Sequence, residues 1–154
     1  MPDRSALLES VIAESRQHYA AWTLFNQAMA DRLGLHPTDL QCLGLLDLQP
    51  EPLGTGEIAK LTGLTPGSAT RLVDRLEKAG MVVRAADPDD RRRALVALAP
   101  GSLAGVEQAW EGPGRAFGEV LERYTDDELT VIGDYLRRVS AVGREQAALL
   151  ARER

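Results

Sequence analysis

Two short helix patterns in direct succession constrain the fold more than any other feature of the chain. In TGEIAKLTG, Thr55 is a suitable N-cap and Gly63 a suitable terminator. In TPGSATRLVDRLEKAG, Thr65 is the expected N-cap, Pro66 suits the first helical position, and Gly80 follows the last turn. Two short helices joined by a tight glycine turn are typical of a helix-turn-helix.

The second of these helices has two distinct faces. Its apolar positions share one face at helical spacing: Ala69, Leu72, Val73 and Leu76. Its polar positions lie on or beside the opposite face: Ser68, Thr70, Arg71, Asp74 and Arg75. Such a helix packs on a core through one side and presents hydrogen-bonding groups and positive charge on the other.

A β-hairpin is predicted directly after this helix. MVVRAA and ALVAL are too short for helices and rich in residues that favour strands. Between them, residues 87–93 (DPDDRRR) hold three acids, a proline that favours a turn, and three consecutive arginines. The hairpin tip is therefore densely charged.

Helices are predicted on both sides of this region. Residues 5–33 form one helix, and a second begins at Pro37 or, through a rival capping box with Gln41, after Thr38. A further segment runs from Pro100 towards Tyr124, with a kink or break expected at residues 112–114 because of its proline.

The last helix has a clear start. Residues 125–128 (TDDE) form a capping box. A helix-packing seam then follows at alternating three- and four-residue steps, and its last part is weak because Gly143 and Gln146 pack poorly: Leu129, Ile132, Leu136, Val139, Gly143, Gln146 and Leu150.

Charge is distributed unevenly along the chain. The 154 residues carry a formal net charge of −5, which by itself argues against non-specific binding to polyanions. Residues 71–93, however, hold seven basic and five acidic side chains, a net of +2, which leaves −7 for the remainder. The composition, 44% hydrophobic and 27% charged, is that of a soluble globular protein. A single cysteine, Cys42, and no visible secretory signal predict a cytoplasmic location.

The run TGLTPGSATRLVDRLEKAGMVVRAADPDDRRRALVALAPG resembles the core of MarR-type winged helix-turn-helix transcriptional regulators. The most specific match is Asp90, Arg92 and Leu98–Ala99, where the family has D-x-R and L-T; the threonine is alanine here. The resemblance implies a mainly α protein with a small β-hairpin wing. Residues 36–99 would form the winged helix-turn-helix domain, and residues 1–35 and 100–154 a helical dimerisation region. It also implies a homodimer on palindromic double-stranded DNA.

The residues expected to contact DNA lie on the second helix of the motif and on the wing. Ser68, Thr70 and Arg71 are expected to contact bases or phosphates, Arg75 a phosphate, and the helix start at Thr65 and Pro66 another phosphate. By the resemblance, Arg92 enters the minor groove and Asp90 supports it through a carboxylate–guanidinium pair, with Arg91 and Arg93 beside it.

Other interpretations of these residues remain open. The charged tip is also compatible with a self-neutralised surface turn, or with a winged-helix module that binds an acidic protein. Cys42 is either an oxidant sensor or a buried small hydrophobic residue. An enzyme is not expected, because no nucleophile–base–acid set is evident, and the isolated His18 and His36 predict no metal site. No cofactor is expected.

Aromatic residues on two helices suggest an effector pocket. His18, Trp22 and Phe25 lie at helical spacing in residues 5–33, and Trp110 and Phe117 in the segment after the hairpin. Members of the family often bind aromatic compounds, so the resemblance implies a repressor that such a ligand relieves. The alternative is that these side chains are simply part of the core.

Overall fold

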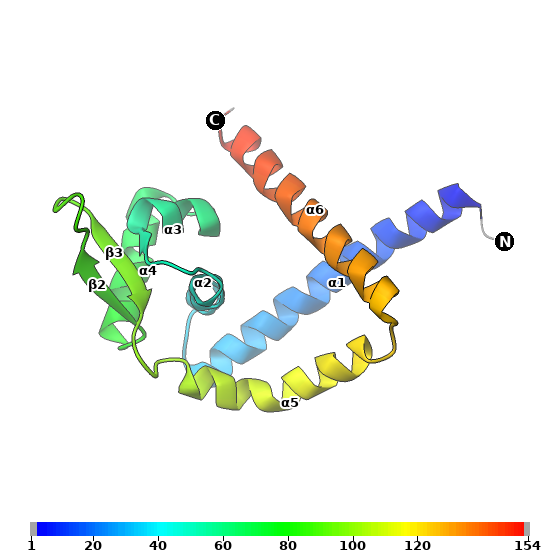
Figure 1. Ribbon diagram of the computed structural model, residues 1–154, viewed down its shortest axis with the longest axis horizontal. Coiled ribbons are helices and arrows are strands. Elements are labelled where there is room, and N and C mark those ends of the chain that lie inside the picture. The colour runs from blue at the N-terminus through cyan, green and yellow to red at the C-terminus, as the bar shows by residue number, and fades with distance from the viewer. Residues whose placement is uncertain (1–2, 153–154) are drawn as a thin grey trace. The chain divides into compact units, whose positions relative to one another are not determined.

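The computed structural model describes residues 3–152 and is mainly helical with a small antiparallel sheet (Figure 1). The elements follow in the order α1 (Arg4–Leu33), α2 (Pro37–Asp47), β1 (Leu53–Gly54), α3 (Thr55–Thr62), α4 (Pro66–Lys78), β2 (Val82–Ala86), β3 (Ala94–Leu98), α5 (Ala104–Leu121) and α6 (Asp126–Arg152). The mainly helical fold with a hairpin wing is confirmed. The chain divides into two compact units, one ending at Ala109 and one beginning at Trp110.

The first two helices begin and end at the signals that the sequence carries. Gly34 adopts the left-handed conformation, φ 67°, and ends α1. Of the two predicted starts of α2, Pro37 is the first helical residue, and His36 is the N-cap. The imidazole Nδ1 of His36 accepts a hydrogen bond from the backbone N–H of Thr38 at 3.3 Å. An isolated histidine therefore has a local structural role.

The helix-turn-helix has the predicted boundaries with one correction. The N-cap of α3 is Gly54 rather than Thr55, which is the first helical residue. The carboxylate of Glu57 accepts a hydrogen bond from the backbone N–H of Gly54 at 2.7 Å. A side chain in the first turn of α3 thus provides the partner for the backbone donor of the N-cap residue. Thr65 caps α4 by accepting the N–H of Ser68 at 3.2 Å, and Pro66 follows it as predicted.

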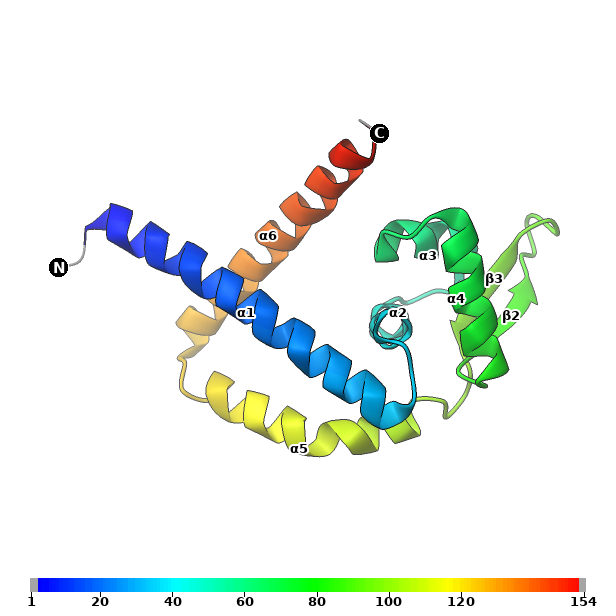
Figure 2. The same cartoon turned by 180° about the vertical axis from the view of Figure 1, so that it is seen from behind.

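The core of the first unit lies between α2, α3, α4 and the sheet. The buried apolar cluster contains Cys42, Leu43, Leu46, Ile58, Leu72, Val73, Leu76, Val82 and Val96. It has no aromatic side chain, in keeping with an aromatic content of 5%. The predicted apolar face of α4 supplies three of these residues, so its polar face is directed away from the core. Figure 2 shows α4 packed between α3 and the β2–β3 hairpin.

The sheet contains a strand that sequence patterning did not predict. Its order is β1–β3–β2, with both pairs antiparallel. Strands β2 and β3 form the predicted hairpin, in which Arg84 pairs with Val96. The added strand, β1, is only two residues long and pairs with Val96 and Leu95. A two-residue segment has too few positions to show alternation, so no period could identify it.

The helices after the sheet are continuous. Helix α5 runs through Pro113. Of the kink or break expected at residues 112–114, the break is therefore wrong, and the kink stays a prediction. The proline removes one N–H from the helical ladder, but the turns on either side keep theirs. The capping box of α6 is confirmed: Glu128 accepts the Thr125 N–H at 2.8 Å, and the Thr125 hydroxyl accepts the Glu128 N–H at 3.3 Å. No helix within residues 3–152 is long and apolar enough to span a bilayer.

Candidate nucleic-acid interface

The first turns of α4 present a connected row of polar side chains. The Thr65 hydroxyl donates to Ser68 Oγ at 3.0 Å, and Arg71 Nη2 donates to the same oxygen at 3.1 Å. The hydroxyl of Thr70 donates back to the carbonyl of Pro66 at 3.0 Å. Thr65, Thr70 and Arg71 are exposed and Ser68 is half-buried. The hydrogen bond to Ser68 draws the Arg71 guanidinium towards the start of the helix. The predicted residues of this face are thus brought together.

Arg75 lies in an environment that the sequence analysis missed. Its Nε and Nη2 donate to the two carboxylate oxygens of Asp39 on α2, at 3.0 and 2.6 Å. Asp39 is buried, with 3% of its surface exposed, whereas half of the Arg75 side chain remains exposed. The hydrogen bonds that Arg75 donates to Asp39 raise the pKa of Arg75 above its ordinary value. The predicted phosphate contact of Arg75 stays a prediction, while its contact with α2 is structural.

A sequence signal for this ion pair does exist. The buried positions of α2 are Asp39, Cys42, Leu43 and Leu46, which are spaced three, one and three residues apart. Asp39 therefore occupies the apolar stripe of its helix, where a carboxylate needs a partner. The pattern indicates a buried ion pair, but it does not identify which cation completes it.

The aspartates of the wing build its turn. Asp90 Oδ1 accepts the backbone N–H of Arg92 at 3.0 Å, and the Asp90 carbonyl accepts the N–H of Arg93 at 2.9 Å. Asp87 Oδ1 similarly accepts the N–H of Asp89 at 2.9 Å. The expected pair between the Asp90 carboxylate and the Arg92 guanidinium is not formed within the described residues. Short acidic side chains readily accept a hydrogen bond from the backbone N–H two residues further on. The Asp90 carboxylate therefore stabilises the loop and does not pair with the Arg92 guanidinium.

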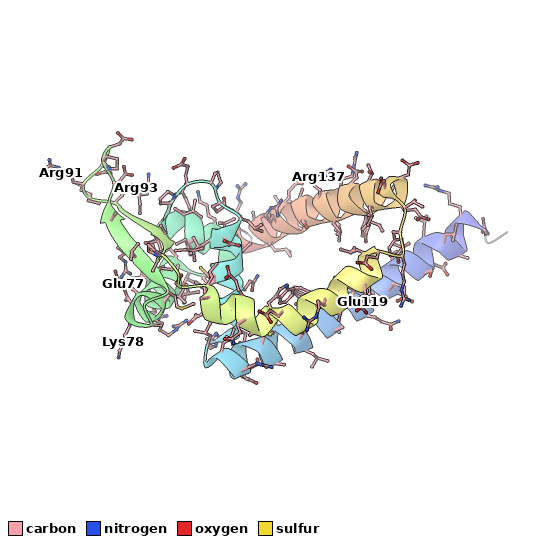
Figure 3. The ribbon with its side chains drawn as sticks, turned by 60° about the horizontal axis from the view of Figure 1, so that its bottom comes forward. Glu77, Lys78, Arg91, Arg93, Glu119 and Arg137 are labelled. Atoms are coloured by element: carbon pink, nitrogen blue, oxygen red, sulfur yellow. The ribbon has the colours of Figure 1, made fainter. Side chains whose placement is uncertain are left out.

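The three arginines of the wing are not equivalent. Arg93 Nη2 lies 3.3 Å from Glu57 Oε2, and its Nε lies 4.0 Å from Asp87 Oδ2. Within residues 3–152, the side chains of Arg91 and Arg92 form neither an ion pair nor a hydrogen bond, and both are exposed. Figure 3 shows Arg91 at the tip of the hairpin, projecting outward, and Arg93 nearer to the rest of the domain.

Ion pairing neutralises some of the basic residues of 71–93 and leaves the unpaired positive charge on a few others. Arg84 on β2 pairs with Asp74 at 2.5 Å and also with Glu77, which joins the hairpin to the C-terminal half of α4. These hydrogen bonds raise the pKa of Arg84. Among the described basic residues of 71–93, those without an ion pair are Arg71, Lys78, Arg91 and Arg92. Figure 3 shows Lys78 at the opposite end of the hairpin region from Arg91, which lies at the hairpin tip.

The aromatic residues form two separate clusters. On α1, the ring centroids of His18 and Trp22 are 6.3 Å apart and those of Trp22 and Phe25 are 5.5 Å apart. On α5, the rings of Trp110 and Phe117 stack at 5.7 Å with an interplanar angle of 12°. Each cluster belongs to its own unit, and the pocket that would combine them stays a prediction.

Cys42 is a buried side chain with 1% of its surface exposed. Burial, and secondarily the nearby negative charge of Asp39, raise the pKa of the Cys42 thiol to about 11. Oxidant-sensing thiols need a lowered pKa and exposure, because the thiolate is the reactive form. The environment of Cys42 favours the small-hydrophobe interpretation over the sensor.

Comparison with known proteins gives a consistent result. Residues 33–93 match the family model described as the MarR family. The chain is 36% identical over 143 residues to the uncharacterized HTH-type transcriptional regulator YcgE of Bacillus subtilis (strain 168), covering 93% of this chain and 92% of that protein. It is 30% identical over 100 residues to the HTH-type transcriptional repressor YetL of the same strain, covering 62% and 60%. A MarR protein from Peptoclostridium difficile DA00132 shares the fold, with a TM-score of 0.64, 21% identity and 97% of each chain covered.

Proposed function

Because the chain belongs to the MarR family of DNA-binding transcriptional regulators, we propose that it binds a palindromic operator as a homodimer. In this proposal α4 enters the major groove and the β2–β3 wing reaches the minor groove of the same half-site. The observation that carries it is the pair of polar surfaces on one compact unit: the Thr65–Ser68–Arg71 row on α4, and the unpaired Arg91 and Arg92 on the wing.

The proposed DNA contacts are of three kinds: to base edges, to a phosphate and to the minor groove. Arg71 and Ser68 supply donors and an acceptor that read base edges, with Thr70 beside them. The free N–H groups at the start of α4, near Thr65 and Pro66, favour a phosphate. Arg92, with Arg91 beside it, supplies a guanidinium to a narrow, strongly negative minor groove. Arg75, already paired with Asp39, contributes mainly by fixing α4 on α2.

The proposed dimer rests on the apolar side chains that the single chain leaves exposed. Helix α6 buries none of its described residues, and its seam exposes Leu136, Val139 and Leu150 by 49%, 45% and 63%. The N-terminal half of α1 exposes Leu7, Leu8, Val11 and Ile12 to a similar degree. Apolar surface of this extent marks an association site, and a second copy of this chain is the occupant proposed here. Light scattering should give twice the monomer mass; a monomer at micromolar concentration contradicts this part of the proposal.

We further propose a cytoplasmic repressor whose affinity for DNA falls when a small aromatic compound binds. The support is that the relative YetL is a transcriptional repressor, together with the aromatic clusters on α1 and α5. In these clusters Phe25 is half-buried and the other rings are exposed. Such a ligand acts only if it binds the DNA-competent and incompetent dimers with different affinity. A winged-helix module that binds an acidic protein is the second candidate, favoured only by the charge of the wing.

The decisive experiment is a fluorescence-anisotropy titration of labelled duplex DNA from the upstream region of the gene, at several salt concentrations. Wild-type protein should bind this duplex more tightly than a scrambled one, with affinity that falls steeply as salt rises. Arg92→Ala should weaken binding and lower the log–log salt slope by about one.

The matched control is Arg137→Ala, which removes an equal charge from an exposed position on α6 (Figure 3). It should leave the affinity close to that of wild type. If the upstream duplex is not preferred, selection from a random-sequence library follows. Failure of that selection to enrich a palindrome contradicts the proposal.

A further inference from the structure

Gly54 is a glycine for reasons of space rather than backbone conformation. Its φ of −69° and ψ of 155° are open to any residue, and its backbone pairs with Leu95 as part of β1. A Cβ at this position would lie 2.7 Å from Arg93 Nη2 and 3.2 Å from Glu57 Oε2. The Arg93 guanidinium therefore occupies the space that a side chain at position 54 would fill.

Arg93 is held through its backbone as well as its side chain. Its N–H donates to the Asp90 carbonyl at 2.9 Å, and its own carbonyl accepts the N–H of Asp87 at 3.0 Å, which closes the base of the loop. Its guanidinium reaches Glu57 in the first turn of α3. The same carboxylate oxygen accepts the N–H of Gly54, so one atom ties the hairpin to the start of the helix-turn-helix.

From these contacts we propose that Arg93 is a positioning residue, which fixes the wing to the start of α3 through Glu57 and so aims Arg91 and Arg92. Gly54 favours this contact because, without a Cβ, it leaves space for the guanidinium. The inference rests on the proposed binding of DNA and assigns to the three arginines two different roles. Arg91 and Arg92 meet the nucleic acid, whereas Arg93 sets the direction from which they approach.

Electrostatics and positioning predict opposite effects for one substitution. Glu57→Gln keeps an oxygen to cap the Gly54 N–H but removes a negative charge beside the wing. If Arg93 binds DNA directly, losing this competing acid should strengthen binding to a polyanion. If Glu57 positions the wing through Arg93, the same substitution should weaken binding. Exposed ion pairs contribute little, so the expected loss is about two- to fivefold.

Gly54→Ala provides a test that changes no charge. The added methyl group should displace Arg93 and weaken binding about two- to fivefold, a loss comparable with that of an exposed ion pair. Gly56→Ala is the matched control, because it lies two residues away and an added Cβ meets nothing within 4 Å. In an Arg93→Gln background, Gly54→Ala should cost much less, since the guanidinium is gone and only the 3.2 Å approach to Glu57 Oε2 remains.

The experiment has two arms, both on the full-length protein. The first measures backbone amide ¹⁵N relaxation of residues 89–92 without DNA. Gly54→Ala and Glu57→Gln should increase fast motion there, and Gly56→Ala should not. The second titrates a mixed-sequence duplex at several salt concentrations. Arg93→Gln should weaken binding but leave the salt slope unchanged, whereas Arg92→Ala should lower that slope. Tighter binding by Glu57→Gln, or an unchanged wing in the first arm, overturns the inference. A wild-type protein that binds no duplex refutes the proposed function instead, and the first arm still decides the role of Arg93.

Discussion

Arg75 of α4 donates two hydrogen bonds to the buried carboxylate of Asp39 on α2, and this pair ties the helix that presents the polar row to the core. The two partners differ in environment, because Asp39 is 3% exposed whereas half of the Arg75 side chain faces solvent. Removing Asp39 and removing Arg75 should therefore lower the free energy of unfolding by different amounts.

Arg75→Ala should destabilise the fold more than Asp39→Asn. The first leaves a buried carboxylate without its cation, at a cost of about 3 kcal/mol. The second leaves a guanidinium that water can solvate and should cost about 1–2 kcal/mol. Urea denaturation followed by circular dichroism measures both free energies of unfolding. The reverse order would mean that Asp39 is stabilised by groups other than Arg75.

Arg71→Ala and Arg92→Ala should weaken DNA binding in different ways. Arg71 lies on the face of α4 that we propose enters the major groove, so its loss should cost about 1–3 kcal/mol at the preferred sequence and relax the preference at one base pair. Arg92 should instead affect the preference for A·T pairs beside the half-site. Binding to a panel of single-base-pair variants of the selected operator separates the two patterns. Equal losses across the whole panel for Arg71→Ala would assign it to a phosphate.

The Cys42 thiol should be nearly inert in the folded protein. With a pKa raised to about 11, fewer than about one thiol in a thousand is ionised at pH 7.5. Reaction with an aromatic disulfide reagent should be slow in buffer and fast in denaturant. Cys42→Ser should leave the response of DNA binding to peroxide unchanged. Rapid labelling of the native protein, or peroxide-dependent release that Cys42→Ser abolishes, would restore the sensor interpretation.

Glu128 should titrate below its ordinary range. Hydrogen bonds from the backbone and hydroxyl of Thr125 stabilise its charged form and lower its pKa. A carboxylate with a lowered folded-state pKa stabilises above its unfolded pKa, and this contribution is lost as pH falls through the folded value. Carboxyl ¹³C shifts in an NMR titration measure this pKa directly. Thr125→Val, which removes the hydroxyl donor, should raise it towards the ordinary value; no change would mean that the backbone N–H acts alone.

Local signals predicted the elements of this fold well, because caps and terminators act within a few residues. Thr65, Pro66 and Gly63 each lie where the sequence indicated. The contacts that organise the candidate site join residues far apart in the chain, as Arg75 does with Asp39 and Arg93 with Glu57. Sequence spacing identifies a charge that needs a partner but not the partner itself.

The wing shows the same division. Its turn and its exposed arginines follow from composition, whereas the different environments of Arg92 and Arg93 depend on which way each side chain points from the closed loop. The misplaced cap at Thr55 has a related cause, because Gly54 became the N-cap through Glu57 and through its place in β1. A two-residue strand leaves no periodic trace in the sequence.

The order of the sheet also bears on how the protein avoids aggregation. Unpaired edge strands recruit strands from other chains, and a projecting hairpin is especially exposed to this risk. Here β3 is the central strand, one edge is the two-residue β1, and the other edge is β2, which carries Arg84 at its midpoint. Short edges with a charged side chain offer a poor template for strand addition. The β2–β3 hairpin can thus project from its domain with a low tendency to pair with strands of other chains.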